Sequence, residues 1–191
     1  MNRDLIEHYQ AGSDKLRRAV AGLSREHLQA RPGPGSWSIQ EVIVHLADSD
    51  AISIDRMKRI VAEDNPSLLY ADESAYNDKL HPHEQDLADT LTLLEVGRRQ
   101  WARVLRLLPD EAFERKGIHN RKGEVTLGQL VADYVAHVDD HLKFIHGKRA
   151  NLGRTLAWRR KGDAALFESR LVRKELRPLF FFQTDSHLFS R

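Results

Sequence analysis

The sequence contains no cysteine among its 191 residues. This absence excludes disulfide bonds, thiolate zinc sites and a cysteine nucleophile, and it is typical of a protein in the reducing cytoplasm. No apolar run approaches the roughly 18 residues that a membrane-spanning helix needs. The first ten residues, MNRDLIEHYQ, hold no apolar segment of the kind found in a secretory signal. We therefore expect a cytoplasmic protein that does not cross a membrane.

An excess of positive charge is also lacking outside one end of the chain. Residues 154–191 hold nine Lys and Arg against four Asp and Glu, a net charge of +5, whereas the whole chain carries only +2. The first 153 residues therefore carry −3, and the pI of about 8.9 comes from the end of the chain. A domain without excess positive charge is not expected to bind nucleic acid. We predict a main domain over 1–153 and a basic C-terminal extension over 154–191, to which the sequence assigns no role.

What the sequence does contain is helical periodicity. Apolar residues recur at spacings of three and four in four segments, which cover residues 5–23, 38–63, 87–108 and 126–148. Capping boxes mark the starts of the second and fourth helices, where Ser38 is followed by Glu41 and Thr126 by Gln129. The fourth helix is expected to end near Lys148, before the NLG at 151–153.

The links between these segments indicate the fold class. About 20 residues join the second and third helices, which is longer than most connections. The segment GIHNRKGEVT, before the fourth helix, favours a small hairpin. The prediction is an all-α four-helix bundle with one long crossover between helices two and three, plus the C-terminal extension. The cores of such bundles commonly hold metal or cofactor sites.

The fourth helix carries two histidines four residues apart. Its apolar seam is expected to comprise Leu127, Leu130, Tyr134, His137, His141 and Phe144. Both histidines then face inward one turn apart and can bind one metal ion. The alternative is a pair of hydrogen-bonded core histidines. Burial of two unpaired imidazoles side by side is unfavourable, which favours the metal.

A third ligand is expected from the facing second helix, whose one histidine, His45, follows its cap by seven residues. Three imidazoles leave coordination positions open, as is typical of catalytic rather than structural sites. Imidazole ligands suit several divalent metals. Zinc or nickel is the first expectation, iron is the next, and copper also fits.

Several polar residues lie near these three histidines in the expected register. Asp48 and Asp140 are candidates to orient a histidine, Asp140 as an outer-sphere acceptor beside His137. Asp48 is also a candidate base. Tyr134 is a candidate hydrogen-bond donor to substrate or, alternatively, a plain core residue. His119 either overhangs the site or lies on the surface. Three residues of the crossover are expected to line the entrance to the site, namely Tyr70, Glu73 and Tyr76. The alternative is that the crossover loop is merely solvated.

The segments GSWSIQEVIVHLADSD and VTLGQLVADYVAHVDDHLKFI together resemble the DinB-like superfamily, in particular its YfiT-like branch of metal-dependent hydrolases. The crossover segment LLYADESAYNDKL is similar to that branch as well. The resemblance covers about residues 1–150 and leaves the extension outside. It implies a four-helix bundle, a divalent metal on His45, His137 and His141, and a homodimer.

The resemblance also implies an enzyme that acts on a small molecule. Relatives include S-transferases that use thiols such as bacillithiol or mycothiol, and a thiol-dependent isomerase. Our leading hypothesis is therefore a thiol S-transferase with a metal-activated low-molecular-weight thiol as cosubstrate. A hydrolase that activates water is the alternative, with Asp48 as its candidate base. A non-catalytic metal-binding bundle of the stress response is a third hypothesis.

Overall fold

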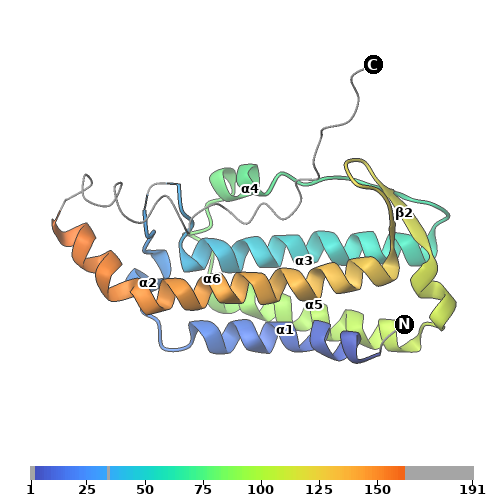
Figure 1. Ribbon diagram of the computed structural model, residues 1–191, viewed down its shortest axis with the longest axis horizontal. Coiled ribbons are helices and arrows are strands. Elements are labelled where there is room, and N and C mark those ends of the chain that lie inside the picture. The colour runs from blue at the N-terminus through green and yellow to red at the C-terminus, as the bar shows by residue number, and fades with distance from the viewer. Residues whose placement is uncertain (1–2, 34, 162–191) are drawn as a thin grey trace, which may run out of the picture.

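Four long helices form the body of the protein, which is a computed structural model that describes residues 3–33 and 35–161. They are α1 (Asp4–Val20), α3 (Ile39–Ala62), α5 (Leu87–Leu107) and α6 (Leu127–Lys161). Helix α1 packs against α5 and α6, and α3 packs against the same two helices, so α1 and α3 occupy opposite corners of a bundle (Figure 1). The predicted four-helix bundle is confirmed.

The starts of α3 and α6 follow from their capping residues. Ser38 Oγ accepts the Glu41 amide at 3.1 Å, and the Glu41 carboxylate accepts the Ser38 amide at 2.6 Å. Thr126 and Gln129 make the same reciprocal pair at 3.1 and 2.8 Å. These bonds satisfy amide donors that a helix start otherwise leaves unpaired. Both predicted capping boxes are therefore present.

The predicted end of the fourth helix is wrong. Helix α6 continues through the NLG at 151–153 and runs to Lys161. A glycine within a helix costs only about 1 kcal/mol relative to alanine, so Gly153 does not by itself stop the helix. The predicted boundary between 153 and 154 thus falls inside α6, and residues 162–191 of the predicted extension lie outside the described residues.

The crossover between α3 and α5 contains a strand and a short helix. Strand β1 (Ser67–Leu68) pairs in parallel with β2 (Lys116–His119), which forms an antiparallel hairpin with β3 (Gly123–Thr126). The hairpin was expected, but its pairing with the crossover was not. Helix α4 (Glu73–Lys79) then lies alongside α3 (Figure 1). The shorter connections hold α2 (Arg25–Gln29) and the 3₁₀ turn η1 (Asp110–Glu114).

A polar layer interrupts the apolar core. One apolar cluster lies around Trp101 and the hairpin, and a second lies around Ile43 and Leu94. Between them Arg98 on α5 is fully buried, and Asp50 on α3 is only 3% exposed. The Arg98 guanidinium binds both carboxylate oxygens of Asp50 and also donates to backbone carbonyls of α1 and α6. One buried ion pair therefore connects all four helices.

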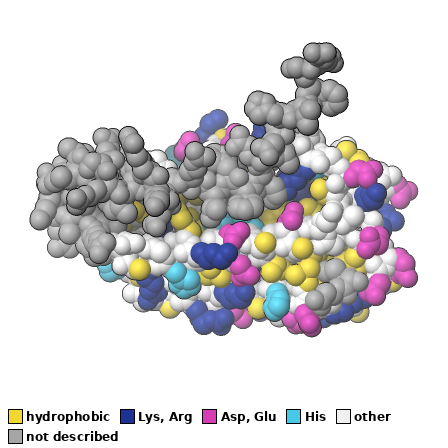
Figure 2. All heavy atoms as spheres, viewed as in Figure 1, with side chains coloured by type: hydrophobic (Ala, Val, Ile, Leu, Met, Phe, Trp, Pro, Cys, Tyr) yellow, Lys and Arg dark blue, Asp and Glu magenta, His cyan; other side chains and the backbone are white. Residues whose placement is uncertain are grey.

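The surface carries charges of both signs. On the face shown in Figure 2, acidic and basic side chains of the described residues are interspersed. Many form ion pairs between helices, such as Arg106 with Glu7 at 2.8 Å and Arg17 with Glu95 at 2.9 Å. Exposed pairs of this kind stabilise a fold only slightly. In the part of the chain that the structure describes, no helix has the length and apolar character required to span a bilayer.

Candidate metal centre

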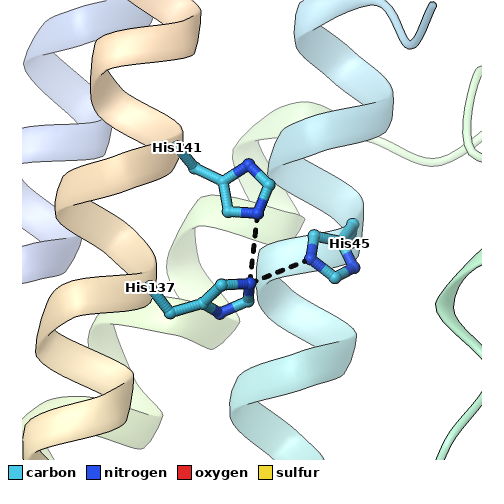
Figure 3. A group of neighbouring side chains, drawn as sticks. All are labelled: His45, His137 and His141. Carbon is cyan, nitrogen blue, oxygen red and sulfur yellow. Dashed lines mark hydrogen bonds between the residues drawn. The ribbon is translucent and has the colours of Figure 1, made fainter. Parts of the chain in front are cut away.

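Three histidine side chains from two helices meet at one point. His45 projects from the second turn of α3, and His137 and His141 project from successive turns of α6 (Figure 3). The His137 Nε2 atom is 3.2 Å from His45 Nε2 and 3.1 Å from His141 Nε2. The structure thus brings together the three residues that the sequence predicted as ligands.

The spacing of these nitrogens fits a metal ion. Zinc–imidazole bonds of about 2.0–2.1 Å place neighbouring ligand nitrogens about 3.0–3.4 Å apart, depending on the geometry. Hydrogen bonding accounts less well for the arrangement. A ring nitrogen offers either one proton or one lone pair, so His137 Nε2 can make only one good hydrogen bond with its two neighbours. A divalent ion would satisfy all three lone pairs at once.

Burial keeps the three imidazoles uncharged, as ligands must be. Desolvation lowers the pKa of His45 to about 3, with a further contribution from His141. Desolvation, followed by the neighbouring histidines, lowers the pKa of His137 to about 2. Desolvation also lowers the pKa of His141 to about 4. At neutral pH protons therefore do not compete with a metal for these nitrogens.

The histidines lie at the border of the core rather than along its centre. The fully buried stripe of α6 runs through Val131, Val138 and Ile145, next to the seam predicted from the sequence. His137 and His141 are half-buried and face α3. His45 is 5% exposed and packs against the Trp37 ring, with centroids 5.2 Å apart. The site therefore has an aromatic wall on one side, and two of its three histidines keep part of their surface exposed.

The structure places the predicted auxiliary residues at different distances from this centre. Tyr134 packs against the centre: its ring centroid is 6.0 Å from that of His137, and its buried hydroxyl accepts a bond from Arg56. Burial raises the pKa of Tyr134, so its hydroxyl keeps its proton at neutral pH. Asp140 accepts a bond from Lys143 at 2.7 Å, on the exposed side of α6.

Two other predicted residues are not joined directly to the histidines. Asp48 is half-buried, and burial raises its pKa. No hydrogen bond between Asp48 or Asp140 and the three histidines occurs among the described residues. His119 does not hang over the site as a loose loop residue. It is buried, and its Nδ1 accepts amide protons from the hairpin turn.

A carboxylate from the crossover approaches the histidines more closely than either aspartate. Glu73 Oε2 lies 3.9 Å from His45 Nε2. Glu73 is the first residue of α4, which Asp72 caps. Desolvation and the neighbouring Asp72 raise the pKa of Glu73. The sequence had suggested Glu73 only as an entrance residue, because nothing in its local pattern fixes how the crossover folds over α3.

Comparison with known proteins agrees with this fold. The model of the DinB superfamily matches residues 8–145. A Bacillus subtilis protein named "Putative metal-dependent hydrolase YfiT" is 30% identical over 145 residues, which make up 75% of this chain and 79% of that protein. A Bacillus licheniformis protein designated in the same way is 31% identical over 139 residues, or 72% of this chain and 79% of that protein.

Solved structures show the same architecture. The structure of YfiT from Bacillus subtilis is described as having an unusual four-helix bundle topology. It superposes with a TM-score of 0.74 at 28% sequence identity, and the match covers 78% of this chain and 86% of that chain. A mycothiol-dependent maleylpyruvate isomerase superposes with a TM-score of 0.58 at 13% identity, over 73% of this chain and 58% of its own, and shares the fold. The chain belongs to the DinB superfamily.

Proposed function

We propose that the protein is a metal-dependent enzyme in which His45, His137 and His141 bind a divalent ion. The observation that carries this proposal is that His137 Nε2 lies 3.2 Å from His45 Nε2 and 3.1 Å from His141 Nε2, in a group whose possible ligand atoms all lie within 4.8 Å of one another. When bound, such an ion lowers the pKa of a thiol or a water molecule and so supplies a nucleophile near neutral pH. Three neutral ligands would leave the double charge of such an ion uncompensated and would leave coordination positions open.

The first candidate reaction is the transfer of a low-molecular-weight thiol to an electrophilic small molecule. Because the chain has no cysteine, the sulfur must come from a cosubstrate. In this proposal Glu73, near His45, takes up the thiol proton, and the protonated Tyr134 hydroxyl donates a hydrogen bond to substrate. The sulfur forms a bond to the electrophilic carbon, and the leaving group departs with the bonding electron pair. The bundle shared with a mycothiol-dependent isomerase supports this choice.

The second candidate is hydrolysis, which the position of Glu73 specifically favours. A water molecule is a far weaker acid than a thiol and benefits more from a base beside the ion. Glu73 is 3.9 Å from a predicted ligand, whereas Asp48, the base suggested by the sequence, makes no bond to the histidines among the described residues. The names of the Bacillus relatives point to the same reaction class.

A thiol panel separates the two reactions. The metal-loaded protein is incubated with a generic electrophile, with and without cysteine, glutathione, mycothiol and bacillithiol. Turnover that requires a thiol and is lost in His137→Ala supports the transferase. Turnover without thiol that falls at least a hundredfold in Glu73→Gln supports the hydrolase. His146→Ala, an exposed histidine of the same helix, is the matched control and should behave as the parent. Metal-bound protein that is inert in every arm would contradict both reactions and leave a binding role.

A further inference from the structure

We propose that Arg56 and Lys122 form an anion-binding subsite beside the three histidines and receive a carboxylate or phosphate group of the substrate. This inference rests on the proposed function, because the subsite would orient a molecule whose reactive end lies at the metal centre. It adds a substrate class to that function: small molecules with an anionic group separated from the reacting atom.

Arg56 reaches the site along the surface between α3 and α6. It follows His45 by eleven residues, which is about three helical turns, so both residues lie on nearly the same face of α3. Arg56 Nη1 donates to the Tyr134 hydroxyl at 3.2 Å, and the Tyr134 ring contacts the His137 ring edge-on. The guanidinium is therefore separated from the metal centre by one tyrosine side chain.

Lys122 approaches the same place from the turn between β2 and β3. Its side chain is 25% exposed, and its ammonium lies 3.6 Å from Asp133 on α6. Asp133 directly precedes Tyr134, which accepts the hydrogen bond of Arg56, so Lys122 and Arg56 are both held at this turn of α6. Burial lowers the pKa of Lys122 itself; Asp133 opposes this effect, and the charge of Arg56 adds to it. Two cations are therefore held near each other with incomplete solvation.

The hydrogen bonds of Arg56 leave capacity for a ligand. Nη1 binds Tyr134, and Nη2 binds the Leu69 carbonyl, so the side chain holds the crossover in place. Its Nε atom is buried and has no hydrogen-bond partner among the described residues. An unpaired buried donor costs about 1–3 kcal/mol, and a guanidinium edge is suited to a carboxylate or phosphate. If Arg56 served only to hold the crossover in place, neither its unpaired Nε–H group nor the nearby Lys122 would be needed.

The surroundings of these two charges contain a buried histidine, a further arginine and carboxylates. The imidazole of His119, on the adjacent strand, stays uncharged because burial and then Arg56, Lys122 and Arg121 lower its pKa to about 4. Among the described residues, Asp133 and Glu73 are carboxylates that face these cations. Glu73 is shared with the His45 imidazole. A divalent ion on the histidines would add to the positive potential, which favours an anionic substrate.

The test titrates inorganic phosphate and, separately, succinate into the full chain, in metal-loaded and in metal-free form. Binding is measured by calorimetry and by the NMR signal of the Arg56 Nε–H group. We expect both forms to bind at least one of the two anions and the Arg56 Nε–H signal to shift on binding. Tighter binding of phosphate would identify a phosphorylated substrate, and tighter binding of succinate a carboxylic acid.

Substitutions locate the anion. Arg56→Gln and Lys122→Gln are each expected to weaken binding at least tenfold. Arg59→Gln is the matched control, because Arg59 lies on the same helix but is paired with Asp55 and Glu63 at the surface. Arg59→Gln should leave binding unchanged. Lys122 lies on a turn, so its variant tests the proposal even if Arg56→Gln perturbs the crossover.

Two outcomes would overturn the subsite. One is the loss of all anion binding in metal-free protein and in His137→Ala, which would place the anion on the ion itself. The other is unchanged affinity in both glutamine variants. If the chain holds no metal yet binds phosphate or succinate through Arg56 and Lys122, the proposed enzymatic function fails and the anion site stands. The two proposals can therefore be told apart.

Discussion

Replacement of Arg98 by methionine should strongly destabilise the protein. Arg98 is completely buried and donates to Asp50 and to the backbone carbonyls of Tyr9 and Tyr134. Arg98→Met would leave the Asp50 carboxylate, which is 3% exposed, without its cation. Breaking a buried ion pair by removing one partner costs about 3–5 kcal/mol. We expect a loss of this size in the free energy of unfolding at pH 7.

The loss should depend on pH. Burial raises the pKa of Asp50, and Arg98 opposes this effect in the parent protein. Without Arg98 the folded-state pKa of Asp50 rises further above its unfolded value of about 3.9. The folded variant then holds a proton that the unfolded chain has released, so its stability falls as the pH rises above about 4. Arg98→Met should therefore be less destabilising at pH 5 than at pH 8.

Urea unfolding of the metal-free protein, followed by circular dichroism, measures both effects. The double variant Arg98→Met with Asp50→Leu removes both charges and should recover at least half of the lost free energy, because apolar residues replace a buried ion pair at little cost. A change below about 1 kcal/mol in Arg98→Met would refute this reasoning. So would a double variant that is no more stable than the single one.

Three further predictions concern stability. Burial lowers the pKa of Lys148 to about 7. Lys148→Met should therefore raise the free energy of unfolding by about 2–4 kcal/mol at pH 7, and the part of this gain that comes from ionisation should vanish above about pH 10.5, where the unfolded chain has also released the proton. Urea titrations at both pH values measure the difference. In metal-free protein, burial keeps His45, His137 and His141 of the folded chain unprotonated, while the same histidines of the unfolded chain take up protons below about pH 6.5. The free energy of unfolding should therefore fall by about 1.4 kcal/mol per pH unit for each of the three as the pH is lowered from about 6.5 to about 4. A flat profile would contradict their burial. Ser38→Ala should lower the melting temperature and cost about 1–2 kcal/mol, because Ser38 Oγ caps α3; an unchanged melting temperature would show that the cap is dispensable.

The bundle and the clustering of the three histidines could be predicted because both depend on local periodicity. The capping boxes fix where α3 and α6 begin, and the spacing of His137 and His141 fixes their common direction. Arg98 was missed, although the sequence carried a signal. The apolar residues Leu94 and Trp101 are seven apart, and position 98 fills the core position between them. A charged residue at such a position requires a buried partner, which is Asp50.

The surroundings of the metal centre could not be predicted in the same way. Glu73, Arg56 and Lys122 meet only because β1 pairs with β2 and carries the crossover across the bundle. That pairing involves two residues of β1 and depends on contacts between segments about 50 residues apart. Neither periodicity nor capping encodes such contacts. The end of α6 was missed for a related reason, since one glycine is a weak stop signal against the cooperativity of a long helix.

The metal content of the purified protein tests the central claim most directly. Elemental analysis of protein prepared without added metal, and again after equilibration with zinc or nickel, should give about one divalent ion per chain. His45→Ala, His137→Ala and His141→Ala should each lose that ion, while His146→Ala, on the exposed side of α6, should retain it. Folding of each variant is checked by circular dichroism. Absence of metal from the equilibrated parent, or unchanged metal content in folded His137→Ala, would contradict the three-histidine site.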